Sequence, residues 1–159
     1  MSSDNKVLVL CATGKVGANV CKALQSAGFE VYGTTRGGKS VATMKSQGLN
    51  PVVCNYADKA SLTKALLECQ CKMVFCITDF FLAAGRSVER EEQQGRDQID
   101  ACKAAGVEFV IYSSACDAEK MGRKVKHLLA KVTVEDYLKA SGLRHTILRP
   151  CAFFEVQVM

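Results

Sequence analysis

The sequence predicts an α/β protein built on a doubly wound parallel sheet. Two observations carry this prediction. Short apolar segments alternate along the chain with longer stretches whose apolar residues recur at helical spacing. A glycine-containing loop also follows the first apolar segment and opens the first helix. Because strands that alternate with long helices indicate right-handed βαβ units, we expect six strands in the order 3-2-1-4-5-6, within three αβα layers.

Each element is placed by its apolar pattern and by the residues that begin or end it. Glycines end several helices, and Asp58 is expected to cap the third. The expected strands are Lys6–Leu10, Phe29–Thr34, Pro51–Cys54, Lys72–Ile77, Val107–Tyr112 and Leu143–Leu148. The expected helices are Lys15–Ala27, Ser40–Gln47, Asp58–Cys69, Ser87–Ala105 and Gly122–Ala140.

Length and composition indicate one globular domain covering residues 1–159, with 48% hydrophobic and 23% charged residues. The net charge of +5 is mild, and the basic run Arg123-Lys124-Val125-Lys126 is typical of a solvated face rather than a nucleic-acid patch. The N-terminus has no signal-peptide pattern, and no apolar run approaches the ~20 residues of a membrane span. We therefore expect a cytoplasmic or nuclear protein without a membrane segment.

The nine cysteines do not predict a disulfide framework, because their number is odd and the expected compartment is reducing. The closest pair, Cys69-Gln70-Cys71, lacks the spacing of a metal site, and no metal is expected. Most of the cysteines fall in strands or on apolar helix faces, where a thiol packs as a small hydrophobe. The alternative role is a redox-sensing thiol, for which Cys11 and Cys151 are the candidates.

The loop after the first strand predicts a dinucleotide site. It comprises Ala12, Thr13, Gly14, Lys15, Val16 and Gly17 and leads directly into a helix. A helix N-terminus offers free N–H groups and a partial positive charge to a pyrophosphate, as in the Rossmann fold. Gly14 lets the backbone approach the ligand closely, and Gly17 lets the helix pack on the sheet. The alternative is a simple tight turn. Cys11 stands where the usual motif has its first glycine, and it is strained if that position needs a positive φ.

The end of the second strand favours NADP(H) over NAD(H). An acidic residue there would bind the ribose hydroxyls of NAD, whereas this chain has Arg36 and Lys39 in the following turn. The guanidinium of Arg36 suits a 2′-phosphate because it makes paired, charge-assisted hydrogen bonds. The alternative is an exposed basic turn without a ligand.

Several segments together resemble the NmrA-like family of atypical short-chain dehydrogenase/reductases. The loop Ala12–Gly17 is similar to the family's GATGxxG motif. The resemblance continues over nearly the whole chain, in Glu91–Gly95 with Ile99–Val107, Val110–Ser114, His127–Lys131 with Val134–Leu138, and Thr146–Glu155.

This resemblance implies NADP(H) bound across the switch point of the sheet. The contacts it implies on the nicotinamide side come from Ile77, Thr78, Ser113, Ser114, Lys131, Pro150 and Phe153. Asn55 stands where the family often has an aspartate near the adenine, so its amide can still hydrogen-bond but carries no charge. Relatives continue for roughly another hundred residues as a substrate domain, most of which this chain lacks.

A catalytic centre is expected around Lys131. Short-chain reductases place a tyrosine four residues before this lysine on the same helix face, and here that position holds His127. His127 either donates a proton or is a hydrogen-bonded histidine without a catalytic role. Ser114 suits the family's serine at the end of the fifth strand. His145, Tyr112 and Tyr137 are interpreted as structural residues.

Two functions follow from these features. The leading hypothesis is an NADP(H)-binding redox-cofactor sensor or regulator, since the tyrosine and the substrate domain are missing. The alternative is an NADPH-dependent oxidoreductase of the quinone or carbonyl reductase type that uses Lys131 with His127 or Ser114. A face left open by the missing domain is expected to bind a second copy or a partner protein.

Overall fold

The computed structural model describes residues 5–121 and 125–151 of the chain. The strands are β1 (Lys6–Val9), β2 (Glu30–Thr35), β3 (Asn50–Val53), β4 (Met73–Ile77), β5 (Phe109–Ser113) and β6 (His145–Leu148). The helices are α1 (Lys15–Ser26), α2 (Lys39–Ser46), α3 (Lys59–Cys69), α4 (Val88–Ala104), α5 (Ala118–Met121) and α6 (Lys126–Ala140).

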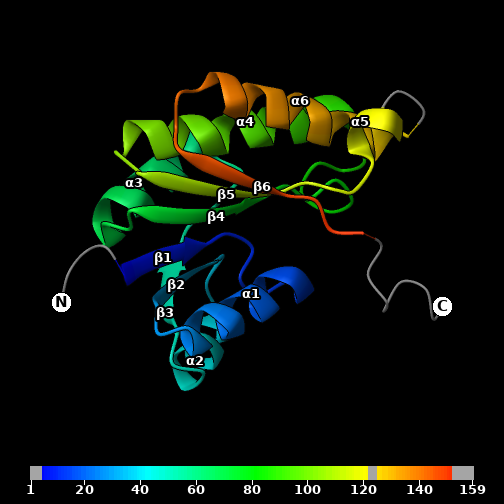
Figure 1. Cartoon of the computed structure of the whole chain (residues 1–159). Helices are drawn as coiled ribbons and strands as arrows, with labels where there is room; N and C mark the ends of the chain where they lie inside the picture. The colour runs from blue at the N-terminus through cyan, green and yellow to red at the C-terminus, as the bar shows by residue number, and fades with distance from the viewer. Residues whose placement is uncertain (1–4, 122–124, 152–159) are drawn as a thin grey trace.

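The six strands form one sheet in the order β3-β2-β1-β4-β5-β6, and every neighbouring pair is parallel. This confirms the doubly wound Rossmann topology expected from the sequence. Helices α1 and α2 lie on one face of the sheet, and α3, α4 and α6 lie on the other (Figure 1). Strands β2 and β3 are added on one side of β1, and β4, β5 and β6 are added on the other side. The loops after β1 and β4 therefore lead to opposite faces of the sheet and diverge at the centre of its carboxyl edge.

Most element boundaries lie within two residues of the expected ones, and Asp58 caps α3 by accepting a 2.6 Å hydrogen bond from the Ser61 amide. One expectation was wrong. The helix predicted over Gly122–Ala140 begins at Lys126, after the extended residue Val125, and a separate short helix α5 precedes it. The N-cap residue Val125 makes no side-chain hydrogen bond to the helix, so no capping signal marks where the helix starts.

A separate apolar core lies on each face of the sheet. Beneath α1 and α2, the cluster includes Val9, Cys21, Met44 and Phe75. On the other face the cluster is larger and joins buried side chains from three helices and three strands. Its members include Leu62 and Leu66 of α3, Ile99 and Cys102 of α4, Val134 and Leu138 of α6, and Leu8, Val74 and Tyr112 of the strands.

All nine cysteines are free thiols, and six of them are buried, as the sequence predicted for most. Cys11 and Cys116 are half-buried and Cys151 is exposed. Within residues 5–121 and 125–151, no cluster of His, Cys, Asp or Glu side chains could hold a metal ion. No helix in the same ranges is long and apolar enough to cross a membrane.

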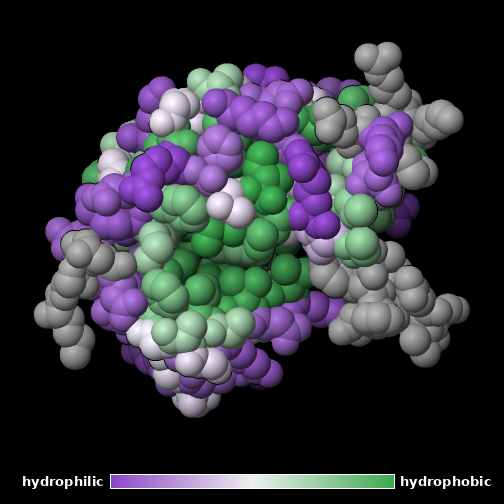
Figure 2. Space-filling view, in the orientation of Figure 1, coloured by the Kyte–Doolittle hydropathy of each residue, from purple (hydrophilic) through white to green (hydrophobic). Residues whose placement is uncertain are grey.

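Apolar side chains gather in a hollow between the two helix layers, on the side where β6 forms the edge of the sheet (Figure 2). Leu148 at the end of β6 is exposed over about half of its surface. The expectation that an open apolar face receives a second copy or a partner protein stays a prediction.

Candidate nucleotide-binding site

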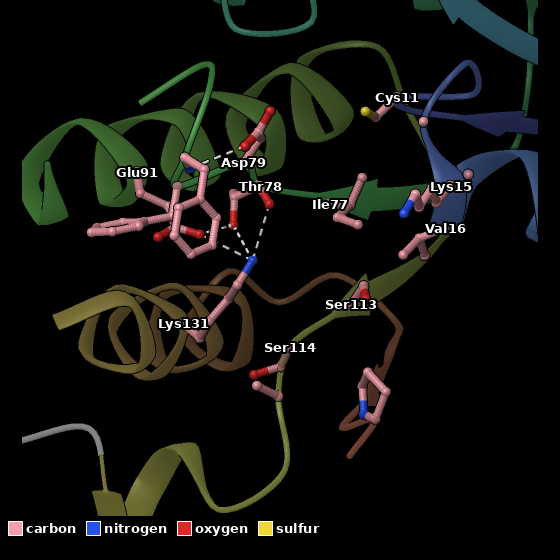
Figure 3. A pocket seen from close by; sticks show the side chains of 16 residues that line it. Cys11, Lys15, Val16, Ile77, Thr78, Asp79, Glu91, Ser113, Ser114 and Lys131 are labelled. Atoms are coloured by element: carbon pink, nitrogen blue, oxygen red, sulfur yellow. Dashed lines mark hydrogen bonds and ion pairs between the residues drawn. The ribbon is translucent and has the colours of Figure 1, made fainter. Parts of the chain in front are cut away.

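A cleft of about 360 Å³ opens at the carboxyl ends of the central strands. Its walls come from the loop after β1, the start of α1, the segment after β4, α4, the segment after β5, α6 and Pro150 beyond β6. The lining residues are Cys11, Gly14, Lys15, Val16, Gly17, Ile77, Thr78, Asp79, Phe80, Phe81, Glu91, Ser113, Ser114, Ala115, Lys131 and Pro150 (Figure 3). The cleft thus brings together most of the site residues that the sequence predicted.

The loop after β1 is packed against the first turn of α1 so closely that only glycine fits. A Cβ on Gly17 would lie 2.2 Å from the carbonyl oxygen of Cys11, and one on Gly14 would lie 3.0 Å from the Cys11 sulfur. Cys11 itself has a φ of +53°, in the left-handed region that glycine favours. The strain anticipated for a cysteine at this position is therefore present, and the Thr34 hydroxyl holds the Cys11 amide at 2.9 Å.

Helix α1 begins without a side-chain cap. Gly14 occupies the N-cap position, no side chain accepts a hydrogen bond from the first turn, and that turn contains no acidic residue. An uncapped helix end presents unsatisfied N–H groups and the positive end of the helix dipole. Because this end lines the cleft, it provides a site for an anion such as a pyrophosphate.

At the opposite end of the cleft, the Lys131 ammonium lies in a compact polar cluster. Its Nζ lies 3.0 Å from Glu91 Oε1, 2.6 Å from the Thr78 hydroxyl and 3.1 Å from the Thr78 carbonyl oxygen. The Thr78 hydroxyl lies 2.7 Å from the same Glu91 oxygen (Figure 3). The Glu91 side chain is fully buried, so Lys131 balances a charge that is removed from bulk solvent.

Three side chains on the buried face of α4 hold the end of β4. Gln98 donates to the Ile77 carbonyl at 3.0 Å, Gln94 accepts from the Asp79 amide at 2.9 Å, and Glu91 bonds the Thr78 hydroxyl. In the described part of the chain, Glu91 Oε2, Gln94 Nε2 and Gln98 Oε1 are buried without a protein partner. Buried polar atoms of this kind are commonly bridged by ordered water.

Three hydroxyl groups come from β5 and the residue that follows it. Tyr112 is buried under the cluster with its hydroxyl 3.4 Å from that of Thr78, and its ring centre lies 5.9 Å from Lys131 Nζ. Burial raises the pKa of Tyr112 above its ordinary value, so this phenol keeps its proton. Ser113 and Ser114 are also buried where they line the cleft.

Beside Ser114, Glu135 of α6 is paired with Arg149 after β6. Arg149 Nε donates to Glu135 Oε1 at 3.0 Å, and its second nitrogen bonds the other carboxylate oxygen. Burial alone would raise the pKa of Glu135, but the hydrogen bonds and charge of Arg149 oppose burial, and the pKa is lowered. Glu135 therefore stays ionised and ties β6 to α6 behind the cleft wall.

The residues predicted to select NADP(H) lie outside the lining of this cleft. Arg36 and Lys39 are exposed, and Lys39 borders a separate hollow that includes Ala12 and Thr13. Asn55 accepts a hydrogen bond from the Ala57 amide and so shapes its own turn. The contacts of these residues with a nucleotide stay predictions.

Tyr56, which the sequence did not single out, connects the two regions. Its hydroxyl is hydrogen-bonded to the Cys11 thiol, and the charge of Arg36 acts on it. Burial, Cys11 and Asp79 raise the pKa of Tyr56 despite the opposing effect of Arg36.

Other predicted site residues have mixed outcomes. The His127 side chain and Phe153 lie outside the described residues. His145 lies in β6 with Nδ1 2.8 Å from the Leu143 carbonyl, in keeping with a structural role. Glu91 and Asp79 were not predicted as site residues. In the sequence, Glu91 is indistinguishable from an acidic residue that stabilises the helix dipole in the first turn of α4. Only the packing of α4 against α6, which pairs Glu91 with Lys131, identifies it as a residue of the cleft.

The chain is similar to two curated proteins over most of its length. It is 27% identical over 147 residues to quinone oxidoreductase 2 of Escherichia coli strain K12, covering 90% of this chain and 47% of that protein. It is 29% identical over 150 residues to the photosystem II assembly factor Ycf39 of Cyanophora paradoxa, covering 94% and 46%. The chain therefore spans about half the length of these relatives.

Solved structures confirm the fold. Triphenylmethane reductase of Citrobacter sp., complexed with NADP(H), superposes with a TM-score of 0.84 at 20% identity, covering 96% of this chain and 52% of that one. The NADPH-dependent quinone oxidoreductase QOR2 of Escherichia coli, complexed with NADPH, gives a TM-score of 0.76 at 26% identity, covering 90% and 48%. The first likeness concerns the fold alone.

The family model supplies the broadest match, because it extends over residues 3–158 and so includes every element of the sheet and the whole cleft. Its extent over nearly the whole chain confirms the family resemblance noted in the sequence. The chain belongs to the NmrA-like family.

Proposed function

We propose that this domain binds NADP(H) and forms the cofactor-binding part of an NADPH-dependent oxidoreductase. One observation carries the proposal: the uncapped N-terminus of α1 and the Lys131 ammonium line opposite ends of the same cleft. The cleft thus offers an anion site and, beyond it, a charged group for the reacting end of a dinucleotide. The NADPH-bound relative QOR2, at 26% identity, supports this arrangement.

The residues present fit this cofactor. Gly14 and Gly17 leave the loop backbone open to a pyrophosphate, and a Cβ at Gly17 would already meet protein backbone. Ile77, Ser113 and Pro150 would lie along the nicotinamide half, and Lys131 would donate hydrogen bonds to its ribose. NADPH supplies a hydride when it is bound. Lys131 would also stabilise negative charge on a carbonyl oxygen beside it.

Arg36 and Lys39 are proposed to bind the 2′-phosphate. Calorimetric titration should show tighter binding of NADPH and NADP⁺ than of NADH. Arg36→Ala should weaken NADPH binding by about 10- to 100-fold, the range expected for a lost charge-assisted hydrogen bond, and should leave NADH unchanged. Lys45→Ala, at an exposed lysine in the last turn of α2, is the matched control. Equal affinity for NADH and NADPH would contradict the assignment of Arg36.

Reductase activity is tested by following NADPH oxidation at 340 nm with quinones and aldehydes. We expect quinone-dependent oxidation that Lys131→Met reduces far more than it reduces NADPH affinity. Lys64→Met, at an exposed lysine on α3, is the control for loss of a surface charge. The quinone class follows the name of the relative quinone oxidoreductase 2.

A sensor or regulator is the second candidate, favoured by the histidine at the position four residues before Lys131 where short-chain reductases have tyrosine. Under this alternative, NADPH and NADP⁺ bind with different affinities and no acceptor supports NADPH oxidation. His127→Tyr separates the two functions. If the chain is a reductase, the variant retains or gains turnover, whereas a sensor shows none in either form.

A further inference from the structure

The parallel pairing of β5 and β6 continues beyond the two strands to a pair of cysteines. The register joins Val110 to His145 and Ser113 to Leu148, a constant offset. The Ser114 amide then donates to the Leu148 carbonyl at 2.8 Å, and the Cys116 amide donates to the Pro150 carbonyl, also at 2.8 Å. In this parallel ladder an amide donates to the carbonyl of the residue that precedes its register partner, as Val110 donates to Arg144 while paired with His145. Because Cys116 donates to Pro150, the register partner of Cys116 is Cys151.

This placement suits a disulfide. Neighbouring strands lie about 4.8 Å apart, within the roughly 4.4–6.8 Å that separate the Cα atoms of bonded cysteines. Register partners also project their side chains on the same side of the sheet. The two thiols are within hydrogen-bonding reach of each other.

The two sulfurs are accessible, unlike most thiols of the chain. Cys151 is exposed and Cys116 is half-buried, whereas six of the nine cysteines are buried. The hydrogen bond with Cys151 and the nearby negative charge of Asp117 raise the pKa of Cys116. The raised pKa disfavours Cys116 as the first nucleophile, and the more exposed Cys151 is the thiol that reacts first with an oxidant.

We propose that Cys116 and Cys151 form a reversible disulfide that fastens together the two segments forming one wall of the cleft. The residues immediately before them, Ala115 and Pro150, line the cleft. The bond would fix the spacing of these segments at the end that we assign to the nicotinamide. Its effect on NADPH rests on the proposed function, but the formation of the disulfide does not.

Oxidised glutathione is the proposed oxidant. The Cys151 thiolate attacks one glutathione sulfur, forms a mixed disulfide and releases one glutathione thiolate. The Cys116 thiolate then attacks the Cys151 sulfur and releases the second. Two protein thiols are oxidised and one oxidised glutathione is reduced to two glutathione molecules, which take up the two protons. Excess reduced glutathione reverses the exchange.

Peptide mapping tests the bond directly, because trypsin places the two cysteines on different peptides with one cysteine each. Cys116 lies on residues 104–120, and Cys151 lies on the peptide that begins at His145. After treatment with oxidised glutathione and alkylation of free thiols, mass spectrometry without reduction should show these peptides joined. Reduced glutathione should separate them. Cys116→Ser should leave Cys151 as a mixed disulfide with glutathione. The control Cys11→Ser should still form the Cys116–Cys151 disulfide.

Two results with the wild-type protein would overturn the proposal. One is glutathione on Cys151 with no Cys116–Cys151 disulfide, and the other is a disulfide between either of these cysteines and a different cysteine of the chain.

Calorimetry on the oxidised and reduced forms then measures the effect of the disulfide on the cleft. NADPH affinity should differ at least threefold between oxidised and reduced protein, and Cys116→Ser should abolish the difference. A joined form with unchanged NADPH affinity would refute the role of the bond in the cleft. Absence of NADPH binding in both forms would refute the proposed function and leave the disulfide established by mapping.

Discussion

Gly95 sets the distance between the two helices that carry the polar cluster of the cleft. A Cβ at this position of α4 would lie 2.3 Å and 2.6 Å from the two Val134 methyl groups of α6, and 3.0 Å from the Val134 Cβ. Glu91 precedes Gly95 by about one helical turn, and Lys131 precedes Val134 by about one turn. The close contact at Gly95 therefore holds α4 and α6 at the spacing that pairs Glu91 with Lys131 at 3.0 Å.

Gly95→Ala should destabilise the domain even though alanine is the better helix former. The propensity gain is about 1 kcal/mol, whereas overpacking a tight core typically costs about 1–3 kcal/mol. Rotation about the Val134 Cα–Cβ bond cannot relieve this overlap completely, because it leaves the Val134 Cβ 3.0 Å from the new methyl group. Because the overlap is severe, the overpacking cost should lie near the upper end of that range, at about 2–3 kcal/mol. We therefore expect a net loss of about 1–2 kcal/mol in the free energy of unfolding, together with weaker NADPH binding.

The partner substitution makes the prediction specific. Val134→Ala alone should cost about 2 kcal/mol, because it removes two buried methyl groups and leaves a void. In the double variant the new Cβ of residue 95 fills that void, so the combined loss should be smaller than the sum by about 1–2 kcal/mol. Urea unfolding followed by circular dichroism measures all three. Additivity within about 0.5 kcal/mol, or a Gly95→Ala variant as stable as the wild type, would refute the packing argument.

Three further outcomes are expected. Gly17→Ala should lower the free energy of unfolding by about 3 kcal/mol, as measured in urea, because its methyl group meets the Cys11 carbonyl at 2.2 Å. Cys11→Gly should be more stable than Cys11→Ala by about 1 kcal/mol, since only glycine relieves the positive φ; equal urea midpoints would exclude that strain. The lowered pKa of Glu135 contributes stability that is fully present above about pH 4.3 and is lost as pH falls through its folded-state pKa. Stability should therefore drop more steeply between about pH 5 and 3 in the wild type than in Glu135→Gln, and parallel pH profiles would contradict this.

The fold was largely predictable because its signals are local. Apolar runs mark buried parallel strands, and Asp58 and the glycines mark helix ends, so the order of elements followed from the chain alone. The exception was the start of α6. Val125 is extended and makes no side-chain cap hydrogen bond, so no capping signal marks Lys126 as the first helical residue.

The cleft was predictable where its residues belong to a local motif. Gly14 and Gly17 were identified from a strand–loop–helix pattern, and Lys131 from its place in a helix motif. Glu91 was not, because its burial depends on the Gly95–Val134 contact between helices distant in sequence. The Cys116–Cys151 juxtaposition was equally hidden, since it depends on the register between β5 and β6.

The hydrogen bonds from α4 to the end of β4 have a consequence for local dynamics. The Asp79 amide lies beyond the strand, yet a buried glutamine holds it at 2.9 Å. It should exchange with deuterium more slowly than a solvent-bonded loop amide, because exchange requires breaking its hydrogen bond to Gln94. Two residues later the chain exposes Phe81, and then Leu82, whose side chain is 86% exposed. The segment that follows β4 and lines the cleft is thus anchored to α4 at Asp79, where the backbone leaves the sheet.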